Sequence, residues 1–597
     1  MSKKNMPIKY TSRDFESIRR DLENFAKRYY SDTYKDFNKA SFGSLMLDTV
    51  AYVGDILSSY LDYQVNESFL DSAVEYNNVV RLARQLGYKL QTSPSSYGLL
   101  TFYVEIPATS TGLGPDSSLV PVLEAGSTFS STGGGFYTLL EDVDFAAENN
   151  QVVVGTANSA TGEPLTYVIR AQGRTVSGRS TVQTFTIGDF VRFRKIKLGA
   201  SNISDIISVV DAEGNEYFEV ESLSQNIIYR AVRNTTATRS TVPNILKAVP
   251  VARRFVVETA NRETSILFGY GSNSNELSNP VVDPSEVLLQ LNGRDYITAL
   301  DFDPTKLIST DKFGIGPSDT TLTVSYRFNT TRDVNAAVDT ITKVEVPRVK
   351  FASQGTLALA SRQAVVQSLE VTNEEQFVGS VALPSSEEIR HRAFGHFATQ
   401  SRAVTGRDYQ ALCYGMPARF GMIKRVAVNK DVDEFKRNVN IYVISENNTG
   451  KLTVANSTLK TNLKSWVSQY KMISDTVDIL DAEIVNFGIK YEVMISIDAN
   501  RFDTINECNR ALTQLFAAKH DIGEPIMISD IYRKLQRVAG VIDTTSVEID
   551  LKSGGAYSES NYNFEAALSS DGRSILAETN IIFELKYPSI DIQGSVR

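Results

Sequence analysis

The stretch Ser44-Leu-Met-Leu-Asp-Thr-Val-Ala-Tyr-Val-Gly-Asp-Ile-Leu-Ser-Ser-Tyr60 predicts a long amphipathic helix. Its apolar residues advance by four, three, four and three positions, which places them on one face of a helix. These residues, which we call the apolar stripe, are Met46, Val50, Val53, Leu57 and Tyr60. A spacing near 3.5 fits a bundle core within one chain, and it equally fits a face that packs against helices of other chains. In the second case Gly43, Gly54 and Gln64 would help to set the register.

A second helix is predicted before this stretch, beginning near Phe15. Thr11 and Asp14 stand three residues apart just before it, which is the spacing of a helix cap. The apolar residues that follow again advance by three and four positions: Phe15, Ile18, Leu22, Phe25 and Tyr29.

A third helix is predicted over about residues 71–86, where apolar residues recur at helical spacing. Gly87 follows it, at the position where a left-handed residue commonly ends a helix. We therefore expect residues 1–95 to form an N-terminal helical segment.

The residues after this segment have the pattern of β-strands. Leu100, Phe102, Val104 and Ile106 alternate with less apolar residues, which is the period-two pattern of a strand with one buried face. No fixed repeat period is visible, so a propeller or a solenoid is not supported. We expect residues 96–350 to form β-rich middle domains. Short β-branched runs, separated by glycine-rich turns, support this: residues 151–154, 184–187, 217–220, 254–257 and 322–326.

The final third alternates predicted helices and strands, which indicates α+β structure. We divide it near Gly450 into an α+β domain over residues 351–450 and a C-terminal α+β domain over residues 451–597. The fold class expected for the whole chain is multidomain α+β. Helices are predicted at about 385–399, 405–415, 455–470, 503–519 and 528–538, and strands at 423–428, 439–444, 490–497 and 545–551.

Composition excludes several classes of partner. The 597 residues include 61 Lys plus Arg against 70 Asp plus Glu, a net charge of −9. That acidic balance opposes non-specific binding to DNA or to anionic membranes, so we predict no nucleic-acid partner and no membrane insertion. No run of about 18 apolar residues is present to span a bilayer. Two cysteines make no disulfide framework, and no secretory signal begins the chain, so synthesis and assembly in the cytoplasm are expected.

Motifs of catalysis are absent from the sequence. His391 and His396 stand five residues apart, about 140° around a helix, rather than stacked as a metal pair would be. Cys413 and Cys508 lie in apolar helical surroundings without a neighbouring histidine. No nucleophile elbow, zinc-protease helix or phosphate-binding Gly-Lys-Ser/Thr loop occurs. We therefore predict no enzymatic activity, no catalytic residue, no cofactor and no metal site.

A series of short motifs runs in order along most of the chain: Tyr10-Thr-Ser-Arg-Asp-Phe15, Gly43-Ser-Leu-Met-Leu-Asp48, Ala51-Tyr-Val-Gly-Asp55, Tyr60-Leu-Asp62, Arg81-Leu-Ala-Arg-Gln-Leu-Gly-Tyr88, Leu123-Glu-Ala-Gly-Ser-Thr-Phe129, Ile266-Leu-Phe-Gly-Tyr-Gly271, Glu387-Glu-Ile-Arg390, Ser401-Arg-Ala-Val-Thr-Gly-Arg-Asp-Tyr409, Ile522-Gly-Glu-Pro-Ile526, Ser529-Asp-Ile531 and Gly540-Val541. As an ordered series, these motifs resemble baseplate J-like proteins, the wedge subunits of contractile phage tails. One residue departs from the family pattern, because Tyr270 stands where an acidic residue is expected between two glycines.

The resemblance implies a structural role in a virion baseplate. Two copies of the chain would enter each wedge, and their N-terminal helices would bundle with those of another wedge protein. The C-terminal domains would contact neighbouring wedges and close a ring around the tail hub, and sheath-proximal proteins would be further partners. That ring would rearrange on infection and trigger sheath contraction. The residues implied in the N-terminal bundle are Phe15, Ile18, Leu22, Met46, Val50, Val53, Leu57 and Tyr60.

Two predicted helices near residue 400 are rich in charge. The pattern alone fits a solvated helical face with its aromatic residues turned inward. The resemblance favours a polar, rearrangeable contact between like subunits instead. The residues implied in it are Glu387, Arg390, Arg402, Arg407, Asp408 and Tyr409.

Two other functions fit parts of the sequence. A tail-associated glycan hydrolase would need a carboxylate pair in a cleft, which a sequence cannot display. A tail fibre or receptor-binding protein would share the β-rich middle, but it should also show fibrous repeats or a trimeric coiled coil.

Overall fold

The structure is a computed structural model of the 597-residue chain. The chain folds into two compact units: a helical unit, residues 1–90 with 384–400, and a main unit, residues 91–383 with 401–597. Thr11, one half of the predicted cap, lies outside the described residues. The structure describes residues 14–30, 38, 41–90, 94–109, 112–233, 244–260, 263–271, 313–329, 334–352, 357–430, 438–517 and 520–597.

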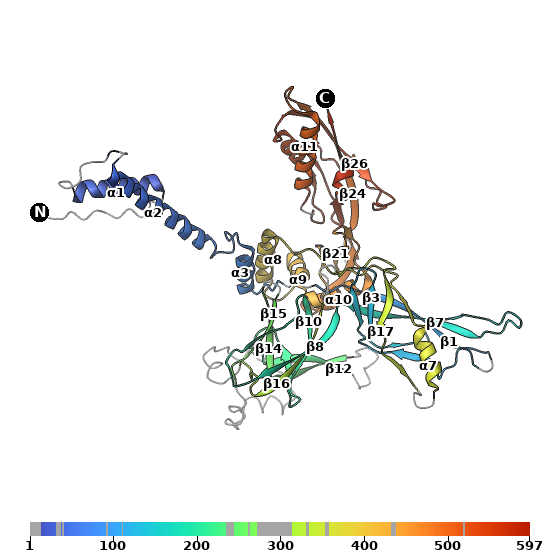
Figure 1. The fold of residues 1–597 in the computed structure, drawn as a ribbon. Helices are drawn as coiled ribbons and strands as arrows, with labels where there is room; N and C mark the ends of the chain where they lie inside the picture. Colours follow the sequence, from blue (N-terminus) through green and yellow to red (C-terminus); the bar gives the residue numbers. More distant parts are fainter. Residues whose placement is uncertain are drawn as a thin grey trace. The chain divides into compact units, whose positions relative to one another are not determined.

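The helical unit begins with two helices joined as a hairpin, α1 (Phe15–Tyr29) and α2 (Phe42–Asn66), which pack on each other (Figure 1). Both begin at the short polar residues that favour helix starts. The Asp14 side chain accepts a hydrogen bond from the Ser17 N–H at 3.2 Å, and the Ser41 hydroxyl accepts one from the Ser44 N–H at 3.2 Å. The helices predicted from the apolar spacing are confirmed.

The second half of this unit pairs α3 (Tyr76–Gln85) with α8 (Ser386–Thr399), a helix that is remote in the sequence. Gly87 has a φ of 89°, the left-handed conformation predicted at the end of α3. The sequence pattern assigned residues 385–399 to the domain that follows residue 350. The packing places them here, because the inward side chains of α8 complete the core of α3. The fully buried residues of this core are Ala73, Val79, Ala83, Tyr88, Ile389 and Ala393.

The main unit begins with a seven-stranded sheet in the order β17-β3-β4-β7-β1-β19, with β6 paired to β7. The predicted alternation is confirmed, since Leu100, Phe102, Val104 and Ile106 are 0 to 2% exposed. Helix α7 (Leu359–Gln367) joins this core although the sequence did not predict it, because it buries only Val365 and so has almost no apolar pattern. The strands are β1 (Tyr97–Pro107), β3 (Thr128–Ser131), β4 (Phe136–Leu139), β6 (Gln151–Val154), β7 (Thr166–Ser177), β17 (Ile341–Val346) and β19 (Glu370–Thr372).

A second seven-stranded sheet follows with its own core. A small sheet of β2 (Pro121–Leu123), β5 (Val143–Asp144) and β18 (Val349–Phe351) and a hairpin of β12 (Ile227–Arg233) and β13 (Asn244–Pro250) accompany the two large ones. The β-rich middle is therefore confirmed. In spatial order the second large sheet contains β8 (Arg179–Ile187), β16 (Thr320–Phe328), β10 (Ile203–Val210), β11 (Glu216–Glu219), β14 (Arg254–Ala260), β15 (Glu263–Phe268) and β9 (Lys195–Lys197).

An α+β module comes next, with α9 (Gly406–Tyr414) and α10 (Ser457–Val467) packed on a four-stranded sheet. Its strands are β20 (Arg425–Lys430), β21 (Asn438–Glu446), β22 (Leu452–Thr453) and β23 (Thr476–Asp481). Trp466 packs in this core, and its indole N–H donates to the Leu412 carbonyl at 2.9 Å. Helix α10 follows Gly450, the predicted division, and yet shares the core of α9.

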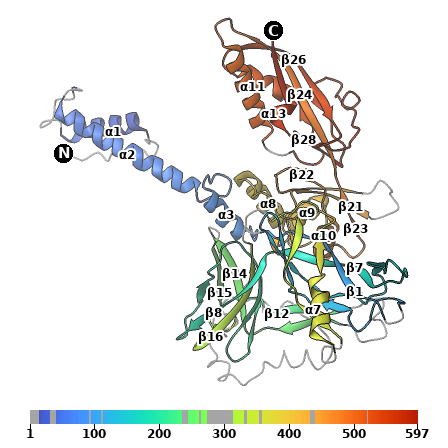
Figure 2. The ribbon, with the colours of Figure 1, turned by 45° about the vertical axis from the view of Figure 1, so that its right-hand side comes forward.

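The last module is also α+β and has a separate core. α11 (Arg501–Leu515) and α12 (Ile528–Gln536) bury Leu512 and Ile531 against a sheet built around β24 (Glu483–Ile495), and Figure 2 shows α11 beside that sheet. β26 (Val541–Lys552), β28 (Ile581–Glu584) and β29 (Ile592–Val596) all pair with β24, while β25 (Ile526–Met527) pairs with β27 (Ser574–Ile575) and α13 (Pro588–Asp591) precedes β29.

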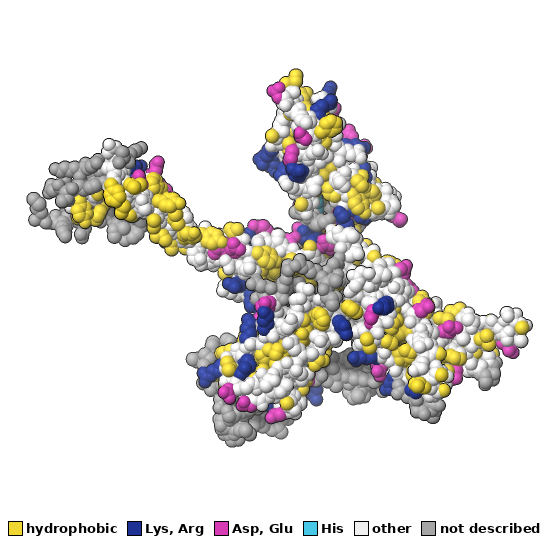
Figure 3. Space-filling view, viewed as in Figure 1, with side chains coloured by type: hydrophobic (Ala, Val, Ile, Leu, Met, Phe, Trp, Pro, Cys, Tyr) yellow, Lys and Arg dark blue, Asp and Glu magenta, His cyan; other side chains and the backbone are white. Residues whose placement is uncertain are grey.

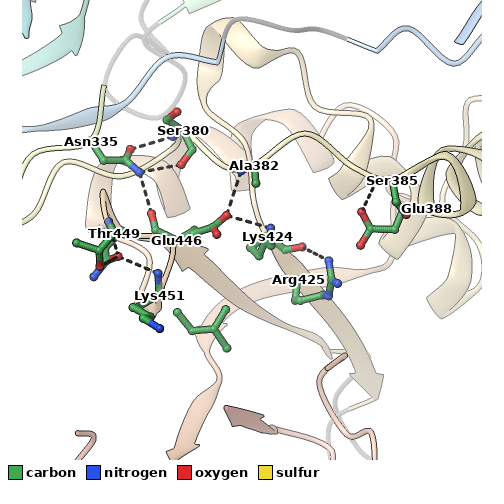
Figure 4. A network of polar contacts seen from close by, with 12 residues as sticks. Asn335, Ser380, Ala382, Ser385, Glu388, Lys424, Arg425, Glu446, Thr449 and Lys451 are labelled. Atoms are coloured by element: carbon green, nitrogen blue, oxygen red, sulfur yellow. Dashed lines mark hydrogen bonds and ion pairs between the residues drawn. The ribbon is translucent and has the colours of Figure 1, made fainter. Parts of the chain in front are cut away.

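A buried polar network ties remote segments of the main unit together (Figure 4). Lys424 Nζ lies 3.0 Å from a Glu446 carboxylate oxygen, and the two side chains are 13% and 8% exposed. The same carboxylate accepts from the Ala382 N–H at 3.0 Å. The Asn335 side-chain amide donates to the backbone carbonyls of Glu446 at 2.8 Å and Ser380 at 2.7 Å. A buried ion pair satisfied in this way fixes the geometry of the segments that supply it.

Replacing Lys424 with Met should lower the free energy of unfolding by about 3–5 kcal/mol, because the Glu446 carboxylate would stay buried without its cation. Trp466 is the single tryptophan and lies in the adjoining core, so its fluorescence during urea denaturation measures the change. Lys464→Met is the matched control, because the Lys464–Asp478 pair is 55% and 54% exposed and should contribute about 0–1 kcal/mol. Equal shifts for the two variants would contradict the prediction.

Candidate interaction surfaces

α2 uses one side of its surface to pack on α1. Ser44 and Ala51 on this side are 2% and 0% exposed. A Cβ placed on Gly54 would lie 3.2 Å from Ile18 Cδ1, so the two helices approach closely where α2 has no side chain. Arg19 of α1 pairs with Asp48 at 2.5 Å. The apolar spacing did not predict this side, although its small residues also advance by helical steps and so leave a signal in the sequence.

The apolar stripe lies on a different side of α2 and is exposed. Its five members, Met46, Val50, Val53, Leu57 and Tyr60, are 50 to 67% exposed. Figure 3 shows hydrophobic side chains gathered along the α1–α2 hairpin. Isolated apolar residues are normal on a surface, but a continuous apolar face on a long helix marks an interaction site.

The residues of α1 that were predicted to join the bundle lie in a helix that packs within the chain. Phe15, Ile18 and Leu22 are half-buried, in a helix that packs on α2 within the same chain. Further large apolar residues of α2 lie outside the stripe and are exposed as well: Leu45, Tyr52, Leu61 and Tyr63.

The charged residues predicted to join like subunits belong to two different compact units. Glu387 and Arg390 lie on α8 in the helical unit, where they pair with each other. Arg390 also donates from Nε to the Leu70 carbonyl at 2.8 Å and from a terminal nitrogen to the Ala73 carbonyl. Arg390 therefore has a structural role inside the helical unit.

The residues on and before α9 divide into internal and exposed groups. Asp408 closes a capping box with Thr405, accepting the Thr405 N–H at 2.8 Å. Tyr409 is 1% exposed, its hydroxyl donates to Asp475 at 2.9 Å, and burial raises the pKa of that hydroxyl. Arg402 and Arg407 are exposed. Among the predicted interface residues of α9 and of the loop before it, these two arginines are the ones whose charge is exposed to solvent.

The histidines and cysteines lie apart from one another. His396 packs edge-on against Tyr88 with ring centroids 6.2 Å apart, and His520 stacks on Phe516. Burial raises the pKa of the Cys413 thiol to about 12 and that of the Cys508 thiol to about 11. Neither thiol therefore forms much of the reactive thiolate near neutral pH. Among the described residues, no group of three or more His, Cys, Asp or Glu side chains could hold a metal ion.

In the described part of the chain, each helix is too short or too polar to cross a bilayer.

Comparison with known proteins identifies a family for the N-terminal segment. Residues 14–85 match the family model of the N-terminal domain of bacteriophage baseplate protein. The chain is also similar to one in a cryo-EM structure of the anti-feeding prophage baseplate, 6-fold symmetrised, at 8% identity, 95% coverage of this chain and 90% of that chain. The TM-score of 0.25 for that pair is too low to carry an argument. No curated protein sequence matches the chain. The matched segment spans α1, α2 and α3, and the match supports the conclusion that the chain is a phage baseplate protein.

Proposed function

We propose that this chain is a structural wedge subunit of a contractile phage-tail baseplate. The exposed apolar stripe carries the proposal, because it lies on α2 within the segment that matches a baseplate domain. Two copies of the chain and another wedge protein would contribute helices that cover the stripe. The assembled wedges would form a ring around the tail hub, and its rearrangement would release the sheath. The role is structural rather than enzymatic.

The geometry of α2 suits a bundle of several helices. Ala51 lies on the side of α2 that faces α1, and it is the residue directly after Val50 of the stripe. The side that faces α1 and the side that carries the stripe are therefore about 100° apart around the helix. That angle leaves room for another helix on the stripe while α1 keeps its place. Packing of this kind would bury apolar area that α1 leaves in water.

The charge of α2 favours a protein partner over a membrane. Its charged residues are Asp48, Asp55 and Asp62, spaced seven apart, and the helix contains no Lys or Arg. Helices that lie on membranes usually carry basic residues that meet anionic lipids. Aspartates would be repelled by such lipids, whereas the polar edge of a helical bundle accommodates them.

Replacing Val53 and Leu57 together with Asp should abolish entry of the chain into a wedge complex. The two carboxylates would lose hydration inside the bundle, at a cost of several kcal/mol, and incorporation should fall by at least about tenfold. Both side chains are at least 50% exposed in the single chain, so its own unfolding free energy should change by only about 0.5 kcal/mol. Co-expression with neighbouring tail proteins, followed by light scattering of the purified complex, measures incorporation.

The control for that experiment places two carboxylates on exposed apolar residues of the main unit. Leu113 and Leu165 are 85% and 54% exposed. The variant Leu113→Asp/Leu165→Asp should enter the complex at the unmodified yield. A Val53→Asp/Leu57→Asp chain that also did so would refute the bundle.

Contacts between like subunits form the second part of the proposal, and we expect them to depend on Arg402 and Arg407. A polar contact suits a ring that must later open, because its two states then differ by only a few kcal/mol. The full chain should self-associate weakly at low ionic strength and less as salt screens the charges. Arg402→Glu/Arg407→Glu should remove that association in sedimentation velocity.

The intact chain is the right sample for this measurement, because a fragment beginning at residue 385 would separate α8 from α3. Arg510→Glu provides the control, since Arg510 is an exposed arginine on α11 that pairs with Glu507. If both variants behaved as the unmodified chain does, Arg402 and Arg407 would have no part in the contact.

A further inference from the structure

The joint between α2 and α3 comprises residues 67–75, which we call the elbow. A connection of this length between two helices has backbone groups that neither helix satisfies. The first residue before α3, Glu75, makes no capping hydrogen bond with its own side chain. Without other support this joint would bend easily.

Glu67 supplies that support from the end of α2. Its backbone N–H still belongs to the helix and donates to the Tyr63 carbonyl at 2.9 Å. Its carboxylate accepts from the Val74 N–H at 2.7 Å, the Glu75 N–H at 3.2 Å and the Asn78 side-chain amide at 2.8 Å. One residue thus ends α2 and caps α3.

The environment of Glu67 favours its charged form. The residue is 7% exposed, and the negative charge lies at the N-terminus of α3, where the helix dipole favours an anion. The hydrogen bond from Asn78, followed by that from the Val74 N–H, lowers the pKa of the carboxyl. The carboxylate is therefore held as the acceptor that this position needs.

Arg390 holds the same elbow from α8. Its guanidinium donates to the carbonyls of Leu70 and Ala73, which lie between Glu67 and the first backbone group that Glu67 binds, the Val74 N–H. Ala73 is also fully buried in the core shared by α3 and α8. The planar donors of arginine fix two acceptors in a single geometry, which a lysine cannot do.

We propose that Glu67 and Arg390 lock the elbow, so that the α1–α2 hairpin and the α3–α8 pair move as one lever. The chain joins this lever to the main unit at three places, after residues 90, 383 and 400. A movement of α8 would therefore be transmitted to the apolar stripe rather than absorbed at residues 67–75. This inference concerns the mechanics of the helical unit and holds whatever partner covers the stripe.

Distance measurements between spin labels test the lock in the full chain. Ser59→Cys on α2 and Ala398→Cys on α8 place one label on each side of the elbow, and both residues are exposed. Cys413 and Cys508 are buried, and the chain with only these two cysteines serves as the labelling control. Double electron–electron resonance should give one narrow distance distribution for the labelled chain.

Glu67→Gln and Arg390→Gln should each broaden that distribution by at least about twofold, because the elbow would then open locally. Glu387→Gln is the matched control: Glu387 is 74% exposed and pairs with Arg390, so its loss should leave the distribution narrow. Milder variants, Asn78→Ala and Arg390→Lys, decide the outcome if far-UV circular dichroism shows that a Gln variant has lost helix. A broad distribution in the labelled parent chain, or a narrow one in every folded variant at positions 67, 78 and 390, would overturn the proposal.

Discussion

α2 carries apolar side chains around more of its circumference than a single neighbouring helix can cover. α1 takes the side on which Ser44, Ala51 and Gly54 allow close approach. The larger side chains of the stripe stay in water, although burying apolar surface is worth roughly 25 cal/mol per Å². The apolar surface of α2 that α1 leaves exposed is the physical reason for proposing that this chain functions in assembly. The small residues and the large ones lie on separate sides of α2, and each side suits a different distance between helix axes.

Charged residues hold the joints between elements in both compact units. Lys424 and Glu446 link remote segments of the main unit, and Glu67 with Arg390 surrounds the elbow of the helical unit. Such groups contribute little net stability compared with apolar packing, but each must find its partner to be buried. They therefore select one geometry at a joint where apolar contacts alone would allow several.

The charged residues on and near helices α8 and α9 are of two kinds: some bind groups inside their own unit, and others lie at the surface. Arg390 and Asp408 satisfy backbone groups of their own unit, and Tyr409 is buried with its hydroxyl on Asp475. Arg402 and Arg407 keep their charge at the surface. A motif rich in charge thus combines residues that build the fold with residues that are exposed at the surface. The sequence pattern also predicted that the aromatic residues of these helices turn inward. Phe397 of α8 does not, because it is 62% exposed.

The sequence by itself determined much of the secondary structure and the existence of the apolar stripe. Both depend on the spacing of residues along a few turns or one strand, as at Met46 to Tyr60 or Leu100 to Ile106, and spacing is fully present in a sequence. Helix α7 was missed because it buries only Val365 and so leaves no such pattern. Only the tertiary structure decided that α8 packs on α3, that α10 shares the core of α9, and that Arg390 reaches the carbonyls of Leu70 and Ala73. These contacts join residues up to 320 positions apart, and what selects them is the shape and burial of the folded chain, which no local pattern encodes.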